Sequence, residues 1–188
     1  MDIINEGIIQ IENPNLVGHC HLLSKSITIL KVRAIFINSS KQFTGISVAR
    51  DPSTGPAPNS TIFGNLISFT NANTDINYHN FCIRLSTSSS YDLIDYNLCN
   101  SSGNTYWANN GSWVRDLEDW ILSGFDIHSL TGDSALKSPG TPLFDLSLES
   151  RSAAIDRIPS SLCPSKDILG VSRPQGSMCD IGAYEYQG

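Results

Sequence analysis

The stretch SITILKVRAIFIN (26–38) carries the pattern that decides the fold. In its two runs, SITILKV (26–32) and AIFIN (34–38), isoleucine, leucine and valine alternate with other residues. Alternation with a period of two is typical of a β-strand that buries one face. The stretch therefore predicts short strands separated by polar turns.

Runs of the same kind extend along the chain as far as Leu98, and no helical period is visible among them. They are GIIQIE (7–12), GISV (45–48), TIFGNLI (61–67), FCIRL (81–85) and YDLIDYNL (91–98). Ile8, Ile35, Ile62 and Leu93 recur at intervals of roughly 27 to 31 residues, a spacing typical of repeat architectures. With two or three short strands in each unit, this repeat predicts a parallel β-helix of three to four coils. A β-sandwich with irregular loops is the alternative.

The segment GSWVRDLEDWILSG (111–124) changes to a helical period. Ser112 can serve as the N-cap and Gly124 as the terminator. We expect one short amphipathic helix whose apolar side chains pack across the strands instead of forming a sugar platform. Those side chains are Trp113, Leu117, Trp120 and Ile121.

Composition and charge exclude several classes of function. The 188 residues suit one domain, and the net charge is -6 with only 12 lysines and arginines scattered along the chain. A nucleic-acid partner would need clustered basic residues. No apolar run is long enough to cross a bilayer. The 27 serines and 15 asparagines predict a polar surface with few ions.

Cellular location is indicated by sequons and cysteines. The first residues lack the features of a signal peptide, so the chain is either intracellular or exported by a signal that lies outside this sequence. Four N-x-S/T sequons favour export and are candidate glycosylation sites: Asn38, Asn59, Asn100 and Asn110. Of the five cysteines, Cys163 and Cys179 are framed by turn residues and predict a local disulfide. The pairing of Cys20, Cys82 and Cys99 stays open.

The second half of the chain resembles a known family. Its segments SYDLIDYNLCNSSGNTYW (90–107), SGFDIHSL (123–130), TPLFDLSLESRSAAID (141–156) and CPSKDILGVSRPQGSMCDIGAYEYQG (163–188) follow one another. In this order they are similar to the C-terminal regions of right-handed parallel β-helix proteins of the pectate-lyase-like superfamily. The last segment resembles a choice-of-anchor Q domain. The resemblance implies an all-β solenoid in an exported or cell-surface protein that is related in fold to polysaccharide-acting enzymes.

The strand runs and the resemblance together predict an outline of domains. We expect β-helix coils over 1–98, a loop with the short helix over 99–140, and the last strands with a disulfide-stapled cap over 141–188. Ile181, Tyr184 and Tyr186 would form the cap core as a final strand, and the cap would cover the last coil. Residues 1–12 would present a bare coil that upstream coils of a longer protein continue.

The residue types that β-helix lyases use are carboxylates around calcium and an arginine or lysine as base. The candidates are Arg84, Asp92, Asp95, Arg115, Asp116, Glu118 and Asp119. No acidic pair at strand spacing lies beside a basic residue, so a calcium site and any other cofactor lack support. GHCH (18–21) brings at most two histidines to one face, which is too few for zinc. GDSAL (132–136) resembles an esterase block but has no histidine after it.

Three functions are compatible with the sequence. The first is the C-terminal part of an extracellular or cell-surface β-helix protein that binds polysaccharide or another surface glycan, or acts as a scaffold. The second is a polysaccharide lyase or glycoside hydrolase, for which no complete catalytic constellation is visible. The third is an adhesin or structural spacer. Fold alone does not decide among them.

The predicted disulfide has a measurable consequence. Closing a loop of this length stabilises a chain by about 3 kcal/mol in the chain-entropy model. Cys163→Ser should therefore lower the melting temperature by several degrees in calorimetry under non-reducing conditions. An unchanged melting temperature would show that this pair contributes nothing to stability.

Overall fold

The computed structural model describes residues 3–4, 7–12, 18–22, 28–31, 33–38, 43–48, 60–70, 79–85, 91–101, 105–139 and 145–188. This part of the chain is nearly all-β with one short helix, α1 (Leu117–Ile121). The expected all-β class is therefore confirmed. No helix among the described residues is long and apolar enough to cross a membrane.

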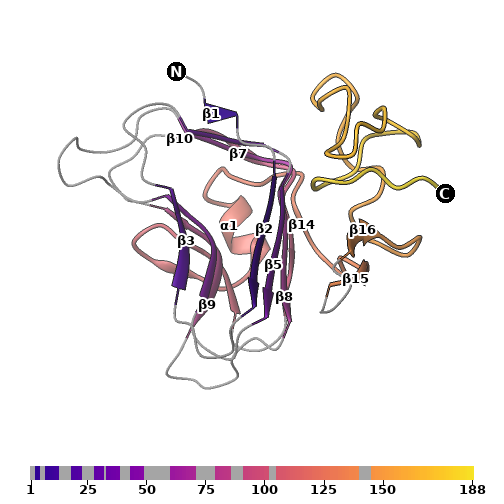
Figure 1. Cartoon of the computed structure of the whole chain (residues 1–188). Coiled ribbons are helices and arrows are strands. Elements are labelled where there is room, and N and C mark those ends of the chain that lie inside the picture. The colour runs from indigo at the N-terminus through magenta and orange to yellow at the C-terminus, as the bar shows by residue number, and fades with distance from the viewer. Residues whose placement is uncertain are drawn as a thin grey trace.

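Three large sheets form a body from residue 3 to residue 131, which we call the three-sheet body (Figure 1). The first sheet holds β1 (Ile3–Ile4), β4 (Thr28–Lys31), β7 (Ser60–Phe63) and β10 (Tyr91–Asp95). The second holds β2 (Gly7–Glu12), β5 (Arg33–Asn38), β8 (Leu66–Thr70), β11 (Leu98–Asn100) and β14 (Leu130–Thr131). The third holds β3 (Gly18–Leu22), β6 (Phe43–Val48), β9 (Asn80–Leu85), β12 (Thr105–Asn109) and β13 (Trp113–Val114).

Neighbouring strands in these sheets are parallel and three elements apart in sequence, except for the antiparallel pair β12 and β13. The chain therefore visits the three sheets in turn. Ile35 pairs with Ile67, and Ile62 pairs with Ile94, so each residue meets its partner one full passage later in the chain. The spacing of 27 residues between Ile35 and Ile62 does not reflect strand pairing, because these two residues lie in different sheets.

Apolar side chains from all three sheets meet in one core inside the body. Ile46 and Ile83 of the third sheet, Ile67 of the second and Ile62 of the first are at most 1% exposed. A disulfide joins Cys82 on β9 to Cys99 on β11 within this core, which resolves two of the cysteines that the sequence left unassigned.

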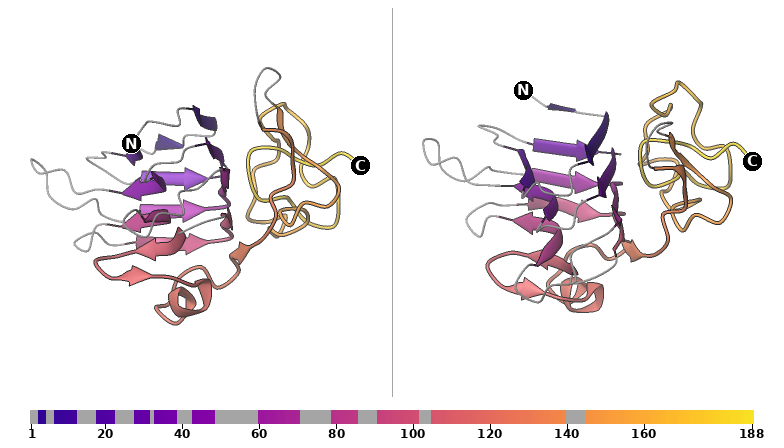
Figure 2. Two further views of the ribbon diagram at one scale, coloured as in Figure 1. Left: turned by 90° about the horizontal axis from the view of Figure 1, so that it is seen from below. Right: turned by 60° about the horizontal axis from the view of Figure 1, so that its bottom comes forward.

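The end of the body after β12 is covered by β13 and α1 (Figure 2). Trp120 of α1 is fully buried in the core, and Leu117 packs against it. The predicted helix is too long at its start, because Trp113 belongs to β13 and pairs with Asn109. Trp113 is 57% exposed, so its assignment to the packing face was wrong. Ile121 ends the helix half-buried.

A ladder of polar side chains holds the corner between the first and second sheets. The backbone amide and the side-chain amide of Asn65 both donate to Asn97 Oδ1, at 3.0 and 2.9 Å. The backbone amide of Asn97 donates to Ser129 Oγ at 2.7 Å. Successive positions of this ladder have a sequence separation of 32, so each passage of the chain is tied to the next at the same corner.

Asp126 connects this corner to the end of the body. Its carboxylate is fully buried and accepts a hydrogen bond from Trp120 Nε1 at 2.7 Å and a longer one from Trp107 Nε1 at 3.4 Å. It also accepts from Asn97 Nδ2 at 2.8 Å and from Ser129 Oγ. Burial raises the pKa of Asp126, although these hydrogen bonds act in the opposite direction.

The C-terminal segment, defined here as residues 132–139 and 145–188, lies along the outer face of the second sheet (Figure 1). It contains the antiparallel pair β15 (Leu136–Ser138) and β16 (Asp145–Leu148). Leu66 and Leu98 point into its core while Ile67 and Cys99, their neighbours in sequence, point into the core of the body. The outer face of this sheet is therefore apolar and is covered by the C-terminal segment. The cap was expected over the last coil at the end of the stack, and that expected position was wrong.

The cap residues take irregular structure instead of a final strand. Ile181 is fully buried, and Tyr184 and Tyr186 pack half-buried against the same core. Cys163 and Cys179 are joined by a disulfide. The backbone of Cys179 also pairs with that of Ile158 in an isolated antiparallel β-bridge. The Gly182 amide donates to the Gly64 carbonyl at 3.0 Å, which ties the segment to the body. The domain boundaries expected from the sequence stay a prediction.

Candidate functional site

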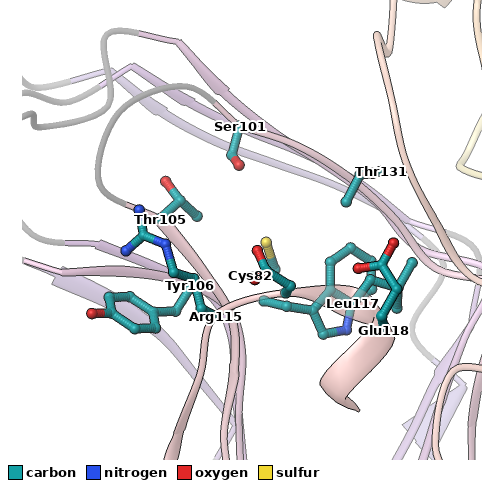
Figure 3. Close-up of a pocket in the computed structure, with 10 residues that line it drawn as sticks. Cys82, Ser101, Thr105, Tyr106, Arg115, Leu117, Glu118 and Thr131 are labelled. Carbon is teal, nitrogen blue, oxygen red and sulfur yellow. The ribbon is translucent and has the colours of Figure 1, made fainter. Parts of the chain in front are cut away.

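A pocket of about 180 Å³ opens where β12, β13, α1 and β14 meet (Figure 3). Hydroxyl groups and charged side chains line most of it: Ser101, Thr105, Thr131, Arg115, Asp116 and Glu118. Trp107 and Leu117 are among the residues that supply its apolar surface. The lining of this small cavity is therefore largely polar, with hydroxyl and carboxylate groups that can form hydrogen bonds.

Arg115 and Glu118 lie on opposite sides of this pocket (Figure 3). The guanidinium carbon of Arg115 is 5.3 Å from the centre of the Tyr106 ring, which places the cation over an aromatic face. None of the ion pairs in the described part of the chain involves Arg115, Asp116 or Glu118. All three are exposed, so their charges are available to a ligand.

An aromatic cluster adjoins the pocket through Tyr106. The ring of Trp113 lies 4.4 Å from His79 and 5.7 Å from Tyr106, and Phe81 is 6.2 Å away beneath it, measured between ring centres. Phe81 is buried, so it anchors the cluster, whereas Trp113 is exposed at the surface. Together they form an aromatic surface beside a polar pocket.

The sequence candidates for catalysis separate into groups. Arg115, Asp116 and Glu118 meet in the pocket, while Asp119 on α1 does not line it. Arg84 is exposed on β9, and Asp95 lies at the corner between the first and second sheets. The side chain of Asp92 lies outside the described residues, as do those of His19, Cys20 and His21. Within the described part, no three His, Cys, Asp or Glu side chains converge as metal ligands would.

Asp95 binds a histidine that the sequence reasoning did not single out. Asp95 Oδ2 is 2.6 Å from His128 Nδ1, and Asp95 Oδ1 accepts the His128 backbone amide at 2.7 Å. The His128 ring stacks on Tyr96 with 4.8 Å between ring centres. Burial, followed by the neighbouring Asp95 charge, raises the pKa of Tyr96. Tyr96 and His128 lie 32 residues apart, and each directly precedes a residue of the corner ladder. An aromatic ring before a polar corner residue in successive passages was the signal that the sequence offered for this stacked pair.

The serine of GDSAL has a structural place. Ser134 is buried, its hydroxyl lies 3.1 Å from Ser68 Oγ, and it accepts a hydrogen bond from Asn100 Nδ2 at 2.9 Å. The side-chain amide of the Asn100 sequon is therefore already bound. Asn110, the other described sequon with a described side chain, is half-exposed in the turn between β12 and β13.

The closing motif folds around a buried ion pair. Arg173 Nε lies 3.5 Å from Glu185 Oε2, and the two side chains are at most 1% exposed. The guanidinium also donates to the carbonyls of Asp180 and Gly182 at 3.0 and 2.8 Å. Glu185 in turn accepts the backbone amides of Gln175 and Asp180. These contacts explain the conspicuous residues of RPQGSMCDIGAYEY as structural ones.

A second cavity of about 370 Å³ lies beside this motif, lined in part by Asp156, Asp180 and Tyr186. The Asp180 carboxylate accepts the backbone amides of Asp156 and Tyr186 at 2.8 and 2.7 Å. Burial raises the pKa of Asp180 to about 6, against these two hydrogen bonds, which lower it. The carboxylate is therefore engaged in folding the segment.

Asp180 predicts an unusual dependence of stability on pH. Its pKa is about 6 in the folded chain against 3.8 for the free side chain, so the folded chain binds this proton more tightly. The stability that Asp180 contributes is largest below pH 4 and falls as the pH rises to 6. Relative to Asp180→Asn, the free energy of unfolding in urea should drop by about 1–2 kcal/mol between pH 4 and pH 7, allowing for solvent screening. A difference that grows with pH would contradict the assignment.

Comparison of the chain with protein-family models, with curated proteins and with solved structures found no match.

Proposed function

We propose that the chain is the C-terminal part of an extracellular or cell-surface protein of the right-handed parallel β-helix class, and that it binds polysaccharide. The β-helix assignment is supported by parallel strands that pair three elements apart and by the corner ladder of Asn65, Asn97 and Ser129. The two disulfides are compatible with an oxidising compartment outside the cell. A choice-of-anchor Q-like role for the C-terminal segment is part of the same proposal.

The observation that carries the binding function is the exposed Trp113 beside the polar pocket. Aromatic rings stack on the apolar faces of sugars, while hydroxyl and carboxylate groups hydrogen-bond to their hydroxyls. Trp113 offers such a ring, and the adjoining pocket offers Ser101, Thr105 and Thr131 together with charged groups. The aromatic surface and the pocket together can contact two neighbouring sugar units of one polysaccharide.

A polysaccharide lyase or hydrolase is the second candidate, because Arg115 meets Asp116 and Glu118 in one pocket. An enzyme would release shorter products from a polysaccharide that it binds, whereas a binding protein would retain it unchanged. An adhesin or spacer would show neither. Product analysis after incubation with the bound polysaccharide separates these functions.

Trp113→Ala tests the proposed binding surface. Loss of the exposed ring should weaken binding of a retained oligosaccharide at least fivefold in isothermal titration calorimetry, since such aromatic contacts contribute about 1 kcal/mol or more. Because Trp113 is mostly exposed, the fold should persist.

Leu169→Ala is the matched control. Leu169 is 68% exposed and lies in the C-terminal segment away from the pocket, so its removal should leave affinity unchanged. Equal affinity of the Trp113→Ala variant and the parent chain would rule out this surface as the binding site.

A further inference from the structure

We propose that the pocket selects neutral sugars and that Asp116 and Glu118 are the residues that reject acidic ones. This inference rests on the proposed polysaccharide-binding function and names its ligand class. The alternative is that Arg115 binds the carboxylate of an acidic sugar, so that the pocket selects acidic ligands.

The charges that line the pocket favour this selection. Arg115 contributes one positive charge, and Asp116 and Glu118 contribute two negative charges. All three are exposed and take part in no ion pair within the described residues, so the carboxylates are not neutralised by a neighbour. The whole chain carries a net charge of -6, which adds to the repulsion of a polyanion.

Arg115 does not reverse this balance. Its guanidinium lies over Tyr106 on the side of the pocket that faces the aromatic cluster, and Glu118 lies across from it (Figure 3). A uronate ring that placed its carboxylate on Arg115 would bring the adjoining acidic units of its chain close to the other two charges. A neutral ring meets no such penalty, and its hydroxyls can donate to both carboxylates.

The size of the pocket sets the length of the ligand. A cavity of about 180 Å³ is smaller than the roughly 300–1,000 Å³ of sites for drug-sized ligands. A ligand of more than one sugar unit would extend beyond the pocket past Tyr106 toward Trp113, whose ring centre is 5.7 Å from that of Tyr106. The ligand is thus a neutral oligosaccharide of two or more units.

Binding of ligands that match in structure and differ in charge tests the selection. Oligogalacturonate, oligoglucuronate and oligomannuronate are each compared by calorimetry at low salt with the corresponding methyl ester and with the corresponding neutral hexose oligomer. We expect binding of at least one neutral ligand and at least tenfold weaker binding of its acidic partner. Raising the salt concentration should narrow this gap, because it screens exposed charges.

The variant Asp116→Asn/Glu118→Gln keeps the hydrogen-bonding shape of both side chains and removes their charges. It should strengthen binding of the acidic ligand about tenfold, because it removes the repulsion of a carboxylate, while the amide oxygens still accept hydrogen bonds from the hydroxyls of the neutral ligand. Asp119→Asn is the matched control, since Asp119 is an exposed carboxylate on the same helix that does not line the pocket.

The outcomes separate the two proposals. Equal or tighter binding of the acidic ligands by the parent chain overturns the selection for neutral sugars and leaves the binding function standing. An acidic affinity that is unchanged in the double variant overturns the role of Asp116 and Glu118. Binding of no saccharide in the panel overturns the proposed function itself, and the selection falls with it.

Discussion

The buried carboxylate of Asp126 is the interaction on which the described structure depends most. A carboxylate in an apolar interior is stable only when its hydrogen-bonding capacity is filled. Here the donors come from two tryptophans of the core and from two positions of the corner ladder. One side chain thereby fixes α1 over the end of the three-sheet body and holds the corner from which β14 continues. The candidate site lies between these elements, so its shape follows from the same carboxylate.

The leucines beside the corner ladder explain where the C-terminal segment packs. Leu66 and Leu98 each follow a ladder asparagine and face outward, and Leu130 packs beside the same core. An exposed leucine row would be a liability on a sheet, and the C-terminal segment covers it. Arg173 and Glu185 of the closing motif bind each other and neighbouring backbone groups. They build a buried ion network that gives this strand-poor segment a fixed shape.

The sequence predicted the class of fold and most strand positions, because alternation of isoleucine with polar residues is a local signal. It could not place the breaks inside TIFGNLI and YDLIDYNL, where Gly64–Asn65 and Tyr96–Asn97 turn the chain between sheets. Three of the candidate residues, Arg115, Asp116 and Glu118, do meet in one pocket. Trp113 was misassigned because its period fits the helix, whereas pairing of β13 with β12 depends on tertiary structure. The roles of Asp126 and His128 depend on contacts between passages of the chain, of which the recurrence of polar corner residues was the trace in the sequence.

The exposed Trp113 and the hydroxyl and carboxylate groups of the pocket lie at the end of the three-sheet body that Asp126 ties to the corner ladder. Hydrogen exchange of Asp126→Asn at neutral pH tests this coupling of the corner and the helix through one carboxylate. The account predicts that the amides of Asn97, Leu98 and Leu130 lose protection together with that of Trp120, because one carboxylate holds both the corner and the helix. Loss of protection confined to the helix, or no loss at all, would contradict it.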